Sequence, residues 1–145
     1  MRTIYDTEET KSTGLANRLI AEKDNPRADV FWSGEPVRPV LLKIKGLTIP
    51  YVSSAAADIS TIYKDTEGHW TGFSARARII LYNSSLVSMD ERPLFILDLA
   101  KSKWRDQVAI ANPLFGTTSV HMAALFIILD DEKARKFMTD LKANG

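Results

Sequence analysis

The stretch that decides the fold class runs from residue 73 to residue 83 and reads Phe-Ser-Ala-Arg-Ala-Arg-Ile-Ile-Leu-Tyr-Asn. Apolar side chains recur at every second position, and this period is typical of a β-strand. One face carries Phe73, Ala75, Ala77, Ile79 and Leu81. The other face carries Arg76 and Arg78, so we do not expect this strand to be buried on both sides along its whole length.

Strand-like and helical segments alternate on both sides of this stretch. Shorter strands are expected at 28–32 and 107–111, and 3–5 is expected to end another. Helical spacing or capping residues predict helices at about 14–23, 37–44, 94–100, 117–129 and 131–143, with Asp130 or Asp131 as the cap of the last. A turn is predicted at 65–68. Strands interleaved with helices favour an α/β fold with a largely parallel sheet flanked by helices. The helix at 117–129 is apolar nearly all round, so we expect it to be internal.

The composition excludes several classes of protein. The chain has 145 residues, a net charge of +1 and no cysteine. It therefore has no disulfide framework, thiolate zinc site or cysteine nucleophile, and no net field attracts it to nucleic acid or acidic lipid. No apolar run approaches the ~18 residues of a membrane helix, and the first residues do not resemble a secretory signal.

The junction at 112–118 is a candidate anion site. It places Gly116, Thr117 and Thr118 at a predicted helix start, where free backbone N–H groups and the helix dipole favour anions. The alternative is simple capping by Thr117 or Thr118. Arg76 is a second candidate, because a guanidinium binds oxyanions through paired hydrogen bonds. Its alternative is a solvated strand face or an ion pair. If Arg76 faced the 112–118 loop, the two would form a two-sided anion clamp.

Two further junctions between a predicted strand and a helix carry polar side chains. Ser33 and Glu35 follow the strand at 28–32, and Thr13 follows the first strand. Ligands of open α/β sheets bind at such carboxyl ends, where Glu35 would serve as a metal ligand or bind a cation. The alternative is that Glu35 is a first-turn carboxylate favoured by the helix dipole, and that Thr13 is a cap.

Recognisable catalytic motifs are absent from the sequence. There is no nucleophile elbow, phosphate-binding glycine loop or dinucleotide fingerprint. Neither His69 nor His121 has a partner at the spacing of a local zinc motif. The sequence therefore predicts that the chain is not an enzyme.

Several segments in order along the chain resemble the type 2 solute-binding proteins of bacterial ABC transporters, in the branch similar to ferric-iron-binding proteins. The segments that carry the resemblance are 5–10, 28–35, 72–83, Asp98-Leu99 with Trp104, 108–113 with 116–118, and Phe137 with 141–145.

The resemblance implies a two-lobed receptor that closes on its ligand, with 1–82 forming part of the first lobe and 83–145 part of the second. Arg76 matches an arginine that holds a synergistic anion such as carbonate or phosphate, and Gly116, Thr117 and Thr118 match an anion-binding helix start. Glu35 lies near a position that supplies a carboxylate to iron in some relatives.

The resemblance also implies that this chain is a fragment of such a receptor. The family's first strand and helix, and its export signal, would precede Met1. Its adjacent iron-binding tyrosines would lie beyond Gly145. We therefore expect weak Fe³⁺ binding or none by this chain alone. The implied partner is an ABC permease, and the implied location is the periplasm, or the cytoplasm if Met1 is the natural start.

Two alternatives stay open. A stand-alone domain with open sheet edges would form a homodimer or larger assembly and have no transport role. An enzyme with a dispersed cleft site is the third possibility, supported only by fold geometry.

Overall fold

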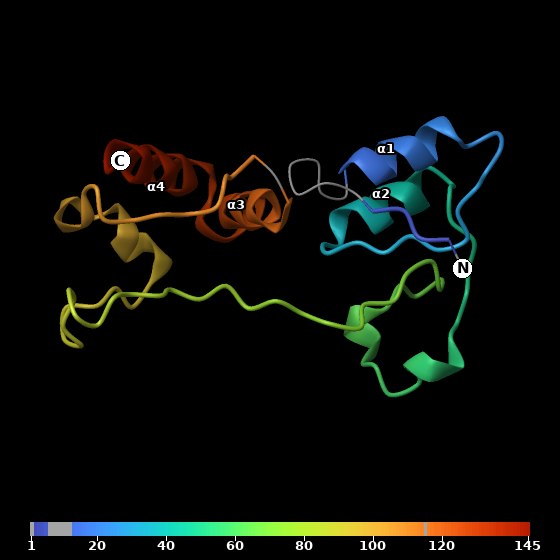
Figure 1. The fold of residues 1–145 in the computed structure, drawn as a ribbon, viewed down its shortest axis with the longest axis horizontal. Coiled ribbons are helices and arrows are strands. Elements are labelled where there is room, and N and C mark those ends of the chain that lie inside the picture. Colours follow the sequence, from blue (N-terminus) through green and yellow to red (C-terminus); the bar gives the residue numbers. More distant parts are fainter. Residues whose placement is uncertain (1, 6–12, 115) are drawn as a thin grey trace. The chain divides into compact units, whose positions relative to one another are not determined.

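A computed structural model describes residues 2–5, 13–114 and 116–145 (Figure 1). The chain forms two compact units. The first comprises Met1–Ala75 and Pro113–Val120, and the second comprises Arg76–Asn112 and His121–Gly145. The division into lobes at 1–82 and 83–145 stays a prediction from the sequence.

The first unit is built around two helices that pack against each other, α1 (Thr13–Ala21) and α2 (Val37–Ile44). Ala16 of α1 and Leu42 of α2 are both buried. Both helices were expected, and Gly46 ends α2 with the positive φ of 68° that favours glycine after a helix. Two 3₁₀ helices follow, η1 (Ser54–Ala56) and η2 (Thr61–Tyr63).

A turn at 65–68, also predicted from the sequence, is joined to α2 by charge. The Lys43 ammonium lies 2.7 Å from an Asp65 carboxylate oxygen and 3.4 Å from Glu67. The hydrogen bond from Lys43 lowers the pKa of the Asp65 carboxyl below its ordinary value, and the same bond raises the pKa of Lys43. Asp65 also accepts from the His69 backbone N–H at 3.1 Å. This ion pair fixes the turn against the helix.

The second unit contains η3 (Ile96–Ala100), η4 (Ser102–Trp104) and α4 (Asp131–Ala143). The helix α4 packs on η3 and buries Ala134 and Phe137. Asp130 caps α4 by accepting from the Lys133 N–H at 3.0 Å, which confirms the predicted cap.

The residue after α4 joins that helix to η3 and η4. The buried Asn144 side chain donates to the carbonyls of Leu99 at 3.1 Å and Lys101 at 2.9 Å. Its own carbonyl accepts from the Asp106 N–H at 2.6 Å. Asn144 therefore does more than end a helix, because it holds two separate segments of the chain against it.

The predicted parallel sheet is wrong for the described residues. These contain no strand, only a single antiparallel bridge between Lys64 and Thr71. The segments 28–32, 73–82 and 107–111 are drawn as plain traces without helices (Figure 1), and most of their side chains are exposed. A period of two indicates local conformation, whereas a sheet also needs a neighbouring strand to pair with each backbone. The alternating pattern therefore predicts an extended conformation, but it does not predict which segment pairs with it.

The expectation of an internal apolar helix is also corrected. The helix α3 (Gly116–Leu129) buries Thr118 and Leu125, but Ile127 is 87% exposed and Ile128 is 74% exposed. A helix that is apolar on all sides would gain free energy by being buried, but its sequence does not show whether another part of the chain covers it. Within the described part of the chain, no helix combines the length and apolar character needed to cross a bilayer.

Candidate functional site

Glu35 lies at the start of α2, where its carboxylate occupies the helix N-terminus. One oxygen accepts from the Val37 N–H at 2.6 Å, and the other from the Arg38 N–H at 3.3 Å. The Ser33 hydroxyl donates to the same carboxylate at 3.2 Å. The side chain satisfies N–H groups that a helix end leaves without partners, and its negative charge complements the helix dipole. Both carboxylate oxygens are thus engaged inside the protein.

Ser33 and Glu35 form a reciprocal pair. The Glu35 backbone N–H donates to the Ser33 hydroxyl oxygen at 3.2 Å, while that hydroxyl donates to the carboxylate. Glu35 is only 9% exposed, so the carboxylate is buried in its capping position. Glu35 lies two residues before α2 and so is not a carboxylate of its first turn, but its contacts with the first N–H groups of the helix are those that the helix dipole favours.

The start of α1 is joined to the start of α2 by a side chain that sequence reasoning missed. The Arg38 guanidinium donates to the Thr13 hydroxyl at 3.0 Å. Arg38 lies in the first turn of α2, where a positive charge opposes the helix dipole. This unfavourable placement was the one sign in the sequence that Arg38 has a partner elsewhere. The structure thus brings Thr13, Ser33 and Glu35 together around Arg38 within the first unit.

The first turn of α3 contains the remaining hydroxyl candidates. Thr118 is 7% exposed and Thr117 is half-buried. Because α3 begins at Gly116, both threonines lie inside the helix rather than at the capping position. The Ser119 hydroxyl donates to the Gly116 carbonyl at 2.8 Å. The alternative in which Thr117 or Thr118 caps α3 stays a prediction from the sequence.

Arg76 is exposed and begins the second unit, whereas Gly116, Thr117 and Thr118 belong to the first. The two-sided clamp between them stays a prediction. Across residues 2–5, 13–114 and 116–145, no three His, Asp or Glu side chains gather as a metal site would require. Among the candidate site residues, the structure connects Thr13 at the start of α1 with Glu35 at the start of α2, through Arg38.

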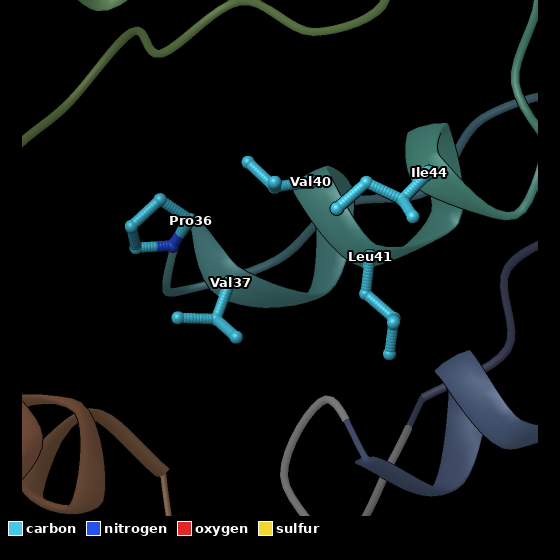
Figure 2. A pocket seen from close by; sticks show the side chains of 5 residues that line it. All are labelled: Pro36, Val37, Val40, Leu41 and Ile44. Carbon is cyan, nitrogen blue, oxygen red and sulfur yellow. The ribbon is translucent and has the colours of Figure 1, made fainter.

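A shallow groove lies along α2 and is lined by Pro36, Val37, Val40, Leu41 and Ile44 (Figure 2). All five side chains are apolar. Such a lining offers no hydrogen bond to an anion and no ligand to a metal. This groove is therefore not the site of a charged solute.

Comparison with known proteins gives the family. Bacterial extracellular solute-binding proteins match residues 25–145. The chain is 28% identical over 130 residues to an Fe(3+)-binding periplasmic protein of Serratia marcescens, covering 90% of this chain and 38% of the relative. It is 33% identical over 113 residues to a probable ABC transporter periplasmic-binding protein of Sinorhizobium fredii, covering 78% and 32% respectively.

A third relative is the major ferric iron-binding protein of Neisseria meningitidis, 23% identical over 137 residues, with 93% of this chain and 41% of the relative covered. The chain thus spans between about a third and two fifths of the length of these relatives. No solved structure matches the chain.

The matched region covers 25–145, and so includes Ser33, Glu35, Arg76 and the α3 start. The family is one of binding proteins and not of enzymes, which confirms the prediction that the chain is not an enzyme. The predicted resemblance is confirmed as well: the chain belongs to the family of bacterial extracellular solute-binding proteins.

Proposed function

We propose that the chain is part of the solute-binding component of a bacterial ABC importer for ferric iron, with an oxyanion bound beside the metal. The observation that carries this proposal is the series of relatives, among them two named for binding ferric iron and one named as part of an ABC transporter. Periplasmic location, an ABC permease as partner and a periplasmic-binding fold belong to the same proposal.

The oxyanion is carbonate or phosphate, and Arg76 is its principal ligand in this proposal. The support is chemical, because an exposed guanidinium presents paired donors that match an oxyanion. The α3 start, with Gly116, Thr117 and Thr118, contributes backbone N–H groups at a helix N-terminus. Ser33 and Thr13 supply hydroxyl groups at the starts of α2 and α1.

Glu35 is the proposed carboxylate ligand of Fe³⁺. This role requires the carboxylate to exchange its bonds with the Val37 and Arg38 N–H groups for the metal. Fe³⁺ is a hard cation that prefers several anionic oxygens, and one carboxylate with one oxyanion is a sparse set. We therefore expect the isolated chain to bind Fe³⁺ weakly or not at all.

The oxyanion half is tested by titrating inorganic phosphate into the purified chain and following binding by calorimetry. Arg76→Ala is expected to lower phosphate affinity about tenfold or more, the effect of losing a charge-assisted hydrogen bond. Arg78→Ala removes the same charge two residues away and is the matched control. Equal losses in the two variants would reveal a nonspecific charge effect and overturn Arg76 as a ligand.

The iron half is tested by titrating ferric citrate into the chain with and without phosphate. If Glu35 is a ligand, Glu35→Gln removes the residual Fe³⁺ affinity, and added phosphate raises that affinity only in the unsubstituted chain. Unchanged Fe³⁺ binding in Glu35→Gln, together with reduced helix stability, leaves Glu35 with its capping role alone.

A further inference from the structure

Asn144 and Gly145 form a dipeptide that is chemically labile. An asparagine followed by glycine deamidates faster than other asparagines, because glycine has no side chain to obstruct closure of the ring that the reaction needs. Of the five asparagines in the chain, Asn25 and Asn112 precede proline, whose nitrogen carries no hydrogen and cannot close this ring. The sequence alone therefore predicts that Asn144 is the first asparagine to react, ahead of Asn83.

The structure keeps both reacting groups of this dipeptide engaged. Asn144 is 5% exposed, and its side-chain amide donates to the carbonyls of Leu99 at 3.1 Å and Lys101 at 2.9 Å. The nitrogen that must leave as ammonia is thus held by two acceptors. The attacking nitrogen is held as well, because the Gly145 N–H donates to the Lys142 carbonyl at 3.4 Å. In this arrangement neither group is available to the other.

We propose that Asn144 is a deamidation site that opens only when the end of α4 separates from η3 and η4. In the opened chain the Gly145 backbone nitrogen attacks the carbonyl carbon of the Asn144 side chain. A C–N bond forms, the bond to the amide nitrogen breaks, and ammonia leaves with the proton of the Gly145 N–H. Water then hydrolyses the cyclic imide at either carbonyl and gives aspartate or isoaspartate. Iron and oxyanion binding play no part, so failure of this inference would leave the proposed function untouched.

The opening equilibrium sets the rate of this modification. Deamidation is slow compared with local opening and closing, so its rate is the rate in the open chain multiplied by the fraction of time that the site is open. Opening must separate the buried Asn144 amide from two carbonyls and leave them without this donor. Asn144 should therefore react at least about tenfold more slowly in the folded chain than in the unfolded chain.

The product of the reaction cannot restore the closed arrangement. Aspartate at 144 has no N–H to donate to the Leu99 and Lys101 carbonyls, and its negative charge lies at the C-terminal end of α4, which the helix dipole disfavours. The Asp106 carboxylate is close, because a Cβ placed on Gly145 would come within 2.6 Å of its Oδ1. Isoaspartate also lengthens the backbone by a methylene group. Deamidation therefore converts a reversible opening of the end of α4 into a permanent one.

The first test compares two asparagines of the same chain. Asn83 is exposed and precedes the small Ser84, so in the folded chain it should deamidate faster than Asn144. In the chain unfolded by guanidinium chloride, at the same pH and temperature, the order should reverse because Gly145 then decides the rate. Peptide mapping by mass spectrometry over days at mildly alkaline pH gives both rates. If Asn144 reacts first in the folded chain, or no faster in the unfolded chain than in the folded one, the proposal is overturned.

The second test opens the site by substitution. Phe137→Ala weakens the packing of α4 on η3 and should speed deamidation of Asn144 about tenfold or more, with the Asn83 rate unchanged. Phe137→Leu should give a smaller increase, and it keeps the test decisive if Phe137→Ala does not fold. The matched control is Ile44→Ala, at the exposed end of α2, which should change neither rate. An Asn144 rate that neither Phe137 variant alters contradicts gating by the end of α4.

Discussion

Two amphipathic helices of this chain, α4 and α2, differ in how far their apolar side chains are buried. In α4, Ala134 is fully covered and Phe137 is only 4% exposed, while Met138 and Leu141 are half-buried. The apolar stripe of α2, whose side chains Figure 2 shows, is more open: Val37 is 46% exposed and Ile44 is 77% exposed, while Val40 and Leu41 are half-buried. Leu42 of the same helix is fully covered. Each helix shows the spacing that predicts one apolar face.

The difference lies in the neighbours rather than in the helices. The segment η3 packs on α4, and Asn144 bonds to the carbonyls of Leu99 and Lys101 at its end. In α2, Leu42 is buried, whereas the stripe from Pro36 to Ile44 lines an open groove. Amphipathic spacing therefore measures how strongly a helix face favours burial, and the contacts in the structure show whether that burial is achieved.

The largest expected effect breaks the packed side of this comparison. Phe137→Ala removes a buried aromatic side chain and leaves a cavity, so it should lower the free energy of unfolding by about 3–5 kcal/mol. Ile44→Ala, at the exposed end of α2, is the matched control and should change it by no more than about 0.5 kcal/mol. Urea unfolding followed by circular dichroism measures both. Comparable losses in the two variants would mean that the α2 stripe is covered in solution.

The next effect concerns the bonds that hold η3 and η4 to the end of α4. Asn144→Ala leaves the Leu99 and Lys101 carbonyls without this donor, at a cost of about 1–3 kcal/mol. Asn144→Asp keeps the shape but replaces the donor by an acceptor, so it should be at least as destabilising. Urea unfolding midpoints test this order. A stable Asn144→Asp would show that the amide bonds contribute little.

The local elements of this fold could be predicted from the sequence where the signal was itself local. The spacing of Val37, Val40, Leu41 and Ile44 predicted α2, and Asp130 predicted the cap of α4, because both depend on residues within a turn or two. The sheet could not be predicted in the same way. Alternation at 73–82 gave a strand-like pattern, but pairing needs a second segment that no local pattern specifies.

The candidate site shows the same limit. Ser33 and Glu35 could be identified as a polar start of α2, and the sequence left open whether the carboxylate capped the helix or bound a metal. It could not show that Arg38 reaches Thr13, because that contact joins residues 25 positions apart. Family resemblance supplied roles for Arg76 and the α3 start, and those roles rest on chemistry that only binding measurements test.

A smaller effect sharpens the comparison at the start of α2. Glu35→Ala removes the acceptor for the Val37 and Arg38 N–H groups and should lower stability by about 0.5–2 kcal/mol, the usual range for a lost helix cap. Glu35→Gln keeps an acceptor oxygen and should recover part of that loss. Thermal unfolding of the two variants is the measurement. Equal losses would mean that the negative charge, rather than the acceptor, stabilises the helix start.

The smallest effect appears only in acid and concerns the segment that packs on α4. The Lys101 side chain, followed by the N–H groups of Phe95 and Leu94, lowers the pKa of Asp98 from 3.8 to about 2. A depressed carboxyl pKa stabilises the fold above its ordinary value, and that stability is lost as the pH falls through 3.8 toward about 2. Asp98→Asn should therefore be less stable than the unsubstituted chain at neutral pH and should lose less stability over this interval.

A second variant separates the two sources of the Asp98 shift. Lys101→Met removes the ion pair, 2.7 Å long, but keeps the backbone bonds from Leu94 and Phe95, each 2.9 Å. Its acid sensitivity should lie between those of the unsubstituted chain and Asp98→Asn. The pH dependence of the unfolding midpoint gives this order directly. If Lys101→Met matched the unsubstituted chain, the backbone N–H groups alone would hold the carboxylate, as they do in an ordinary helix cap.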